Sequence, residues 1–176
     1  MNLPNTLTVA RIVIIPVFIT AVLYHKHRHA LALFVIAALT DLLDGYIARV
    51  TNQKTALGQF LDPLADKFLL VSSFILFSVQ GWIPLWLTIT IISRDLIVVI
   101  GWFLLYLLTH RVTIEPVLLG KTAIALQLIT LTLVLLSINL SSIIPRQEIL
   151  FIVTAALTAI SGLQYIYKGL RLADAI

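Results

Sequence analysis

Long apolar runs separated by short polar connections dominate the sequence. At about 20 residues each, six of these runs are long enough to cross a hydrocarbon layer of roughly 30 Å as helices. They cover residues 7–24, 30–50, 59–79, 84–108, 116–138 and 148–167. No internal repeat or Gly/Ser linker divides the chain, and short connections are typical of a simple antiparallel bundle. The sequence therefore predicts an all-α polytopic membrane protein, a bundle of six transmembrane helices forming one domain over residues 1–176.

Composition supports lipid as the solvent of most of the chain. Of the 176 residues, 60% are hydrophobic and only 11% are charged, and the mean hydropathy is +1.07. A soluble domain of this size needs far more polar surface to cover its core. Cysteine is absent, which excludes disulfides, thiolate metal sites and a cysteine nucleophile.

The Lys and Arg residues near the ends of the apolar runs predict the orientation. Lys and Arg are more frequent on the cytoplasmic side of membrane proteins. If both termini are cytoplasmic, more of the Lys and Arg residues lie inside than outside, so this orientation is favoured. That inner set is Arg11, Arg49, Lys54, Lys67, Arg111, Lys121, Lys168 and Arg171, against Lys26, Arg28 and Arg146 outside. The net charge of +4 is dispersed along the chain, so we expect membrane headgroups rather than nucleic acid as its partner. The start lacks a basic n-region, and we expect no cleaved signal peptide.

The loop from His25 to His29 carries three His, one Lys and one Arg on the side predicted to be outside. Its imidazoles offer ligands for a metal ion. Adjacent residues point in different directions, however, so the sequence favours a solvated polar turn over a metal site.

The chemistry of the chain concentrates in four aspartates. Four of the eight acidic residues fall in one stretch, as the pairs Asp41 and Asp44 and Asp62 and Asp66. On helices, spacings of three and four place the members of each pair on one face, one turn apart. The connecting loop folds the end of the second helix back beside the start of the third, so the two pairs can converge.

Converging carboxylates at the edge of an apolar layer need positive charge nearby. Each charge at membrane depth costs at least about 2.5–3.5 kcal/mol on insertion scales, and Mg²⁺ or Mn²⁺ would relieve this cost and the mutual repulsion. Carboxylates that bridge two such ions form a common phosphoryl-transfer device. The alternative, interfacial charges or structural ion pairs, is weakened because few basic residues (Arg49, Lys54 and Lys67) lie nearby in the sequence to pair with four acids.

The stretch Asp41–Asp66 carries a family resemblance. It fits D-x2-D-G-x2-A-R-x8-G-x3-D-x3-D at every fixed position, and this pattern resembles the signature of the CDP-alcohol phosphotransferases (CDP-alcohol phosphatidyltransferases). The start, Asn2 to Arg11, resembles many bacterial members. Asp62-Pro-Leu-Ala-Asp66-Lys67 resembles the branch of phosphatidylglycerophosphate and cardiolipin synthases.

The resemblance implies an enzyme that transfers the phosphatidyl group of CDP-diacylglycerol to an alcohol and releases CMP. All four aspartates would hold a two-metal centre of Mg²⁺ or Mn²⁺, and Asp66 would also be the general base. The donor pocket would be formed by Asp44, Gly45, Ala48, Arg49 and Gly58, although glycine and alanine at these spacings also serve helix packing. We also expect the protein to form a homodimer. We expect it to lie in a bacterial inner membrane with its active site facing the cytoplasm.

The acceptor depends on three further basic residues. Arg94 and Lys121 lie inside apolar runs, and intramembrane charges are functional candidates; with Arg111 they would bind the phosphate of glycerol 3-phosphate. Arg94 and Asp95 could instead neutralise each other, and Lys121 could extend to the interface. The Ser93-Arg94-Asp95 segment also resembles cardiolipin synthases of this family, whose acceptor is phosphatidylglycerol.

Two other classes compete with the enzyme. A divalent-cation transporter could use the same acids, but the chain shows neither repeated halves nor paired Gly/Pro-broken spans. A non-catalytic membrane scaffold is the third class. Only the enzyme would release CMP.

Overall fold

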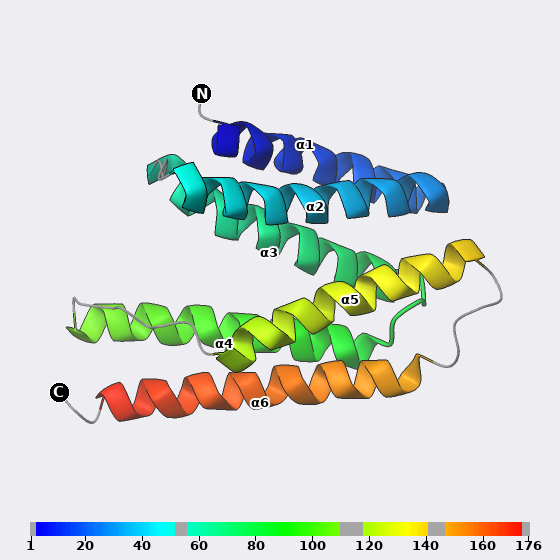
Figure 1. The fold of residues 1–176 in the computed structure, drawn as a ribbon. Helices are drawn as coiled ribbons and strands as arrows, with labels where there is room; N and C mark the ends of the chain where they lie inside the picture. Colours follow the sequence, from blue (N-terminus) through cyan, green and yellow to red (C-terminus); the bar gives the residue numbers. More distant parts are fainter. Residues whose placement is uncertain (1–2, 52–55, 110–117, 141–146, 174–176) are drawn as a thin grey trace. The chain divides into compact units, whose positions relative to one another are not determined.

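Six helices account for nearly all of the chain (Figure 1). The computed structural model describes the backbone of residues 3–51, 56–109, 118–140 and 147–173, and the side chains of 10–40, 67–101, 103–104, 107, 118–140 and 147–171. The helices are α1 (Leu3–Leu23), α2 (His27–Thr51), α3 (Ala56–Val79), α4 (Leu85–Thr109), α5 (Leu118–Leu140) and α6 (Glu148–Ala173). The described residues contain no strand. All six predicted segments are thus confirmed as helices, although α6 continues beyond the predicted end at residue 167.

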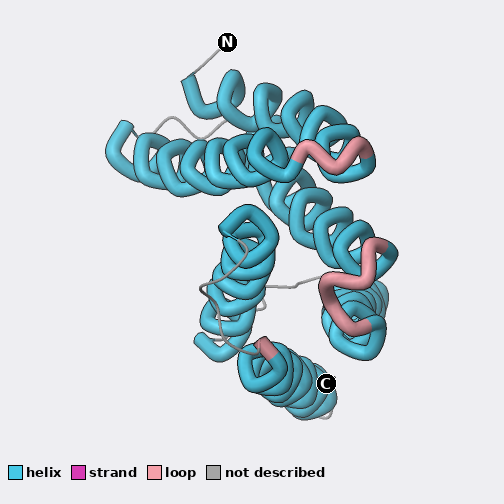
Figure 2. Tube along the Cα trace, turned by 90° about the vertical axis from the view of Figure 1, so that its right-hand side faces the viewer, coloured by secondary structure: helices cyan, strands magenta, loops and turns pink. Residues whose placement is uncertain are grey.

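Short turns join the helices where the connection is described (Figure 2). Gly81 has a positive φ of 73° just after α3, the left-handed conformation in which glycine ends a helix without a steric cost. His25, between α1 and α2, has a φ of 55°, which is uncommon for a residue with a side chain. The tight turn at His25 joins α1 and α2, which pack against each other within one unit.

One compact unit comprises Met1–Gln80 and Leu131–Ile144, and so contains α1, α2, α3 and the end of α5. In this unit α1 packs against both α2 and α3. The ring centroid of Phe18 on α1 lies 5.8 Å from that of Phe34 on α2 and 6.3 Å from that of Phe77 on α3. All three side chains are completely buried. Tilted rings at these separations pack favourably, and they hold the three helices together.

The second unit comprises Gly81–Thr130 and Pro145–Ile176, and so contains α4, the first part of α5 and α6. Helices α4 and α6 pack along each other. The apolar core includes Leu87 and Ile91 of α4 and Phe151 of α6. Unusually for a core, the unit also buries Arg94, Asp95, Gln127 and several hydroxyl side chains, which form the site described below.

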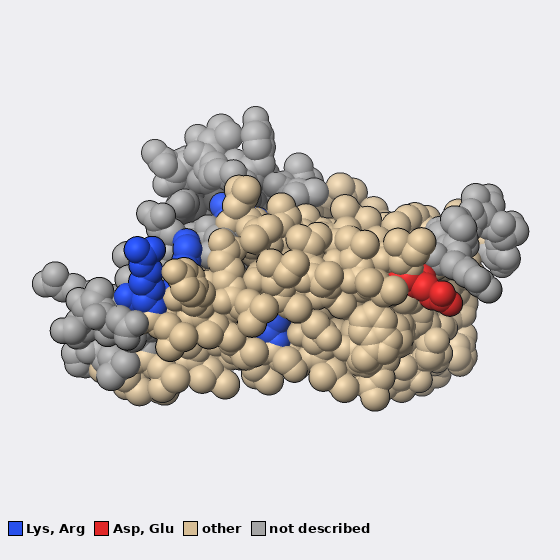
Figure 3. Space-filling model, turned by 90° about the horizontal axis from the view of Figure 1, so that it is seen from below, with Lys and Arg blue, Asp and Glu red and all other residues tan. Residues whose placement is uncertain are grey.

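The outer surface of the helices is apolar. On α4 alone, Leu96, Ile97, Val99, Ile100 and Phe103 are each at least 41% exposed. Charged side chains are sparse on the face shown in Figure 3. Contiguous apolar surface of this kind marks contact with a partner or a membrane.

Two helices of the described chain are long and apolar enough to cross a membrane. They are Leu118–Leu140 and Glu148–Arg171, with mean hydropathies of 2.1 and 1.9. Shorter apolar stretches lie at Ala10–Leu23, His27–Thr40 and Lys67–Val79. The helical class is therefore confirmed, and the crossing of a membrane by all six helices stays a prediction.

Candidate active site

The aspartate pairs lie on two consecutive helices of one unit. Asp41 and Asp44 belong to α2, and Asp62 and Asp66 belong to α3. Their side chains lie outside the described residues, as do those of Gly45, Ala48, Arg49 and Gly58. The helical backbone confirms the premise of the spacing argument, because residues three or four apart on a helix share a face. Four residues, 52–55, separate the end of α2 from the start of α3, so the chain length allows the two pairs to meet.

A completely buried arginine accompanies this part of the unit. Arg11 on α1 has no exposed surface, and α1 packs against both aspartate-bearing helices. Arg11 and Asp41 lie almost equally far along the chain from the turn at His25. In two antiparallel neighbouring helices (Figure 1), this places both positions at a similar level. From the sequence, Arg11 is only a charge near a helix end. The structure shows that it is buried, and a buried guanidinium requires compensating negative charge or hydrogen bonds.

The second unit holds Arg94 in a specific geometry. Its side chain is 5% exposed, and its Nη1 donates a hydrogen bond to Oδ1 of Asp95 at 2.8 Å. Its Nε donates to Oγ of Ser161 on α6 at 3.1 Å. The guanidinium carbon lies 5.4 Å from the ring centroid of Tyr165, also on α6, within range of a cation–π interaction. Arg94 is thus fixed by a charge, a hydroxyl and an aromatic face.

Arg94 lies against two glycines, Gly120 and Gly162, whose lack of a side chain makes room for it. A Cβ at Gly120 of α5 would lie 3.1 Å from Nη2 of Arg94 and 3.0 Å from Oη of Tyr165. A Cβ at Gly162 of α6 would lie 3.2 Å from Cγ of Arg94. All three separations are tighter than ordinary carbon contacts of about 3.5–4.0 Å. Any larger residue at either position would displace the arginine or its neighbours.

Of the three basic residues predicted to bind the acceptor, the structure describes the side chains of two. Arg94 is buried, Lys121 is exposed, and Arg111 lies outside the described residues. Lys121 follows Gly120 directly on α5, so its backbone is close to the arginine. Ser161, Gly162 and Tyr165 were not predicted from the sequence. The Ser-Gly pair inside an apolar helix was the available signal, because small residues there mark close helix contacts.

Buried hydrogen bonds continue from Arg94 along the contact of α5 with α6. Nε2 of Gln127 donates to Oγ1 of Thr158 at 3.1 Å. The hydroxyls of Thr130 and Thr154 lie 2.8 Å apart. All four side chains are buried, and buried polar groups require partners. These pairs set the register of the two helices that carry Gly120 and Ser161.

The histidine-rich turn between α1 and α2 lies entirely within the described residues. Among the described residues, no three His, Cys, Asp or Glu side chains come together as metal ligands. The imidazoles of His25 and His27 meet edge to face with centroids 5.8 Å apart. The turn is exposed except for His27, which is half-buried, in agreement with the polar turn that the sequence favoured.

Comparison with known proteins establishes the class. Residues 1–160 match the family model described as CDP-alcohol phosphatidyltransferase. The chain therefore belongs to the CDP-alcohol phosphatidyltransferase family and is a transferase enzyme, as the resemblance in the stretch Asp41–Asp66 indicated.

Individual relatives point to one branch of that family. The CDP-diacylglycerol–glycerol-3-phosphate 3-phosphatidyltransferase of Aquifex aeolicus is 33% identical over 177 residues, covering 98% of this chain and 98% of that protein. The protein of the same name in Bacillus subtilis is 35% identical over 186 residues, covering 96% and 95%. The cardiolipin synthase (CMP-forming) of Rattus norvegicus is 35% identical over 193 residues, covering 99% of this chain and 64% of that protein.

Proposed function

We propose that this protein transfers the phosphatidyl group of CDP-diacylglycerol to glycerol 3-phosphate, forming phosphatidylglycerophosphate and CMP. The observation that carries the proposal is the complete aspartate pattern on α2 and α3 in a chain aligned over nearly its full length with enzymes named for this reaction. The acceptor hydroxyl oxygen forms a bond to the phosphorus that bears diacylglycerol. The bond from that phosphorus to the CMP oxygen breaks, and the hydroxyl proton passes to a base.

The four aspartates supply the donor set for two divalent cations. Carboxylate oxygens are the ligands that Mg²⁺ and Mn²⁺ prefer, and four of them on two helix ends fit this requirement. When bound, the ions would neutralise the pyrophosphate and stabilise charge on the leaving CMP. Asp66 is the proposed base that accepts the hydroxyl proton.

The residues between the two aspartate pairs form the proposed donor pocket. Gly45 and Ala48, in α2, and Gly58, in α3, would provide space beside the carboxylates, and Asp44 would contribute to donor binding as well as to the metal centre. Arg49 provides positive charge for the phosphates. A positively charged group that is already fixed beside the charge that develops in the transition state needs no rearrangement during the reaction.

Arg94 is the proposed anchor of the acceptor phosphate, assisted by Lys121 and Arg111. Arg94 donates hydrogen bonds from Nε and from Nη1 to other side chains. Its Nη2 donates no hydrogen bond to any of the described residues. Nη2 lies beside Gly120, where a Cβ would be only 3.1 Å away. A guanidinium fixed in this way retains a donor for a phosphate oxygen.

Phosphatidylglycerol is the alternative acceptor, which would make the protein a cardiolipin synthase. The observations that favour it are the Ser93-Arg94-Asp95 segment and the identity with the rat cardiolipin synthase. Arg94 would then bind a phosphodiester, which carries one negative charge less than glycerol 3-phosphate at neutral pH.

The cellular setting follows from the same proposal. We infer one domain over residues 1–176, with all six helices crossing a bacterial inner membrane and the site facing the cytoplasm, where the donor is made. Two described helices with sufficient length and hydropathy support the membrane, and the excess of Lys and Arg at the predicted inner ends supports the orientation. A homodimer is part of the proposal.

The decisive experiment supplies purified protein with CDP-diacylglycerol and either glycerol 3-phosphate or phosphatidylglycerol, and identifies the lipid made. We expect CMP release with Mg²⁺ or Mn²⁺, phosphatidylglycerophosphate as product, and loss of both in Asp62→Asn. Glu148→Gln, which removes an exposed carboxylate at the start of α6, is the control. Cardiolipin as the product would select the alternative. A cation transporter or a scaffold would release no CMP, and that result would overturn the proposal.

A further inference from the structure

The turn between α1 and α2 collects positive charge on a defined backbone. It carries Lys26 and Arg28 among His25, His27 and His29. Lys26 N donates to the carbonyl of Ala21 at 2.8 Å, and Nδ2 of Asn139 on α5 donates to the carbonyl of His27 at 3.2 Å. All these residues belong to one compact unit. The charges are therefore presented by a backbone that local and long-range hydrogen bonds hold in place.

Three cavities share this turn. One of about 400 Å³ is lined by the five basic and histidine residues with Ile138 and Asn139. A second, of about 450 Å³, shares Lys26 and His29 with it and continues along α1 and α2. A third, of about 550 Å³, shares Arg28 and Asn139 and continues along α2. A charged hollow thus adjoins two grooves on either side of Ala32, which lines both.

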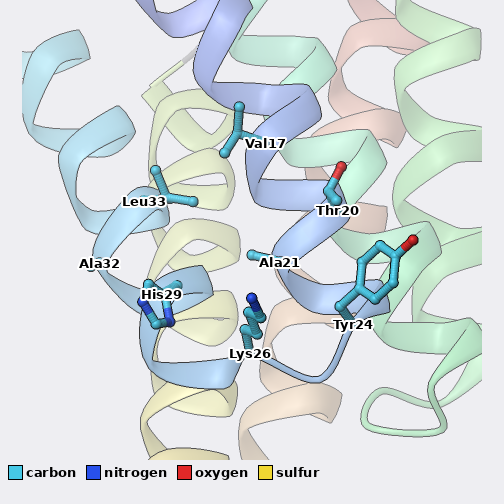
Figure 4. A pocket seen from close by; sticks show the side chains of 8 residues that line it. All are labelled: Val17, Thr20, Ala21, Tyr24, Lys26, His29, Ala32 and Leu33. Carbon is cyan, nitrogen blue, oxygen red and sulfur yellow. The ribbon is translucent and has the colours of Figure 1, made fainter.

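The grooves are apolar away from the turn. In Figure 4, Lys26 points between α1 and α2, with His29 near it and Val17 and Leu33 further along. The other groove is lined by Leu31, Val35, Ile36 and Leu140. A cationic end and apolar walls match an anionic headgroup and its acyl chains.

Among the described residues that line the three cavities, the positive charge has no acidic counterpart. No Asp or Glu lines any of the three cavities, and the first turn of α2 contains no acidic residue. The N-terminal end of a helix is itself positive, and cations there are unfavourable. Cations at the N-terminal end of a helix, without acidic partners, are an unfavourable arrangement of the kind expected at functional positions. An anion bound from outside the protein would neutralise them.

We propose that an anionic phospholipid binds here, with its phosphodiester at Lys26 and Arg28 and its acyl chains in the two grooves. A zwitterionic lipid is disfavoured because its ammonium would face the same cations. This site is distinct from the aspartates, which follow much later on α2 and on α3. The inference requires these helices to meet lipid, and it is independent of the reaction and acceptor proposed above.

Native mass spectrometry of the detergent-purified chain tests the charged end. The probes are phosphatidylglycerol and phosphatidylethanolamine with identical acyl chains. We expect retention of phosphatidylglycerol, and a reduction of about tenfold in Lys26→Gln/Arg28→Gln, because basic clusters at the membrane surface attract anionic lipid. Lys168→Gln/Arg171→Gln removes the same charge from exposed positions on α6 and is expected to retain the lipid. Equal retention of both lipids, or equal loss in both double variants, would overturn the proposal.

A second pair of variants tests the grooves without changing charge. Ala32→Trp fills both, and we expect lower retention of phosphatidylglycerol; Ala156→Trp makes the same change at an exposed position on α6 and should have no effect. Glycerol 3-phosphate carries more negative charge than the lipid headgroup but has no acyl chain. If it displaced the lipid, or if the Ala32→Trp variant bound the lipid normally, the grooves would not hold acyl chains. CMP release, measured on the same preparations, reports separately on the proposed reaction.

Discussion

Nη1 of Arg94 and Oδ1 of Asp95 lie 2.8 Å apart, although they belong to consecutive residues of one helix, whose side chains leave the axis about 100° apart. The contact forms because Ser161 on α6 holds Nε of the same guanidinium at 3.1 Å. The two side chains are only 5% and 12% exposed. They therefore enter the helix contact as an ion pair, while Nη2 lies close to Gly120 and makes no hydrogen bond to the described residues.

Asp95→Asn is expected to destabilise the protein. Removing one partner of a buried ion pair leaves the other charge uncompensated and costs about 3–5 kcal/mol. Thermal unfolding in detergent should show a clear decrease in Tm, whereas Glu148→Gln, at an exposed carboxylate, should leave it unchanged. The double variant Arg94→Gln/Asp95→Asn should recover part of the lost stability without recovering activity. A Tm unchanged in Asp95→Asn would show that the pair contributes little.

Arg94→Gln is expected to impair use of the acceptor rather than of the donor. Hydrogen bonds to charged groups contribute about 1.5–3 kcal/mol, so kcat/KM for glycerol 3-phosphate should decrease about 10- to 100-fold. The KM for CDP-diacylglycerol should change little, because the proposed donor pocket lies on α2 and α3. Lys168→Gln, an exposed cation on α6, is the control. An equal increase in both KM values would argue against a phosphate-binding role.

Gly120→Ala is expected to reproduce much of the Arg94→Gln effect. The new Cβ would lie 3.1 Å from Nη2 of Arg94 and 3.0 Å from Oη of Tyr165, on the side where we place the phosphate. Gly101→Ala provides a matched control, because a Cβ there meets nothing within 4 Å and alanine favours a helix by about 1 kcal/mol. Steady-state kinetics with varied glycerol 3-phosphate should show a raised KM for the first variant only. Normal kinetics in both would place the acceptor elsewhere.

Asp66→Asn separates proton transfer from metal binding. If Asp66 is the base, turnover should decrease by about 10²–10⁴-fold, the usual contribution of general base catalysis. Binding of Mn²⁺, followed by its paramagnetic effect on water relaxation, should weaken less than in Asp62→Asn. Removal of divalent ions by a chelator should abolish CMP release in the parent chain, and added Mg²⁺ or Mn²⁺ should restore it. Near-normal turnover by Asp66→Asn with normal metal binding would show that another group is the base.

The sequence predicted the helices and the residues of the aspartate pattern, and it could not predict the surroundings of Arg94. Apolar runs of membrane-crossing length determine where helices lie, and fixed spacings determine which aspartates share a face. The contacts of Arg94 with Ser161 and Tyr165 join positions far apart in the chain. They depend on which faces of α4 and α6 meet, and a helix that is apolar on all sides carries little periodic signal for this. The burial of Arg11 escaped prediction for the same reason, because a charge near a helix end can face either water or a neighbouring helix.

Gln127 and Thr158 test whether the polar contacts of α5 with α6 hold the arginine site in register. Their side chains are buried and joined at 3.1 Å, so Gln127→Leu and Thr158→Val should each destabilise the protein and the double variant should lose less than the sum. Coupling energies of interhelical hydrogen bonds in membranes average about 0.6 kcal/mol and reach about 1.7 kcal/mol. The coupling energy should be measurable in unfolding by denaturant. The KM for glycerol 3-phosphate should also rise in the single variants, because a shift between α5 and α6 would move Gly120 and Ser161, which contact Arg94. Strictly additive losses with an unchanged KM would show that the hydrogen bond neither couples the helices nor positions the site.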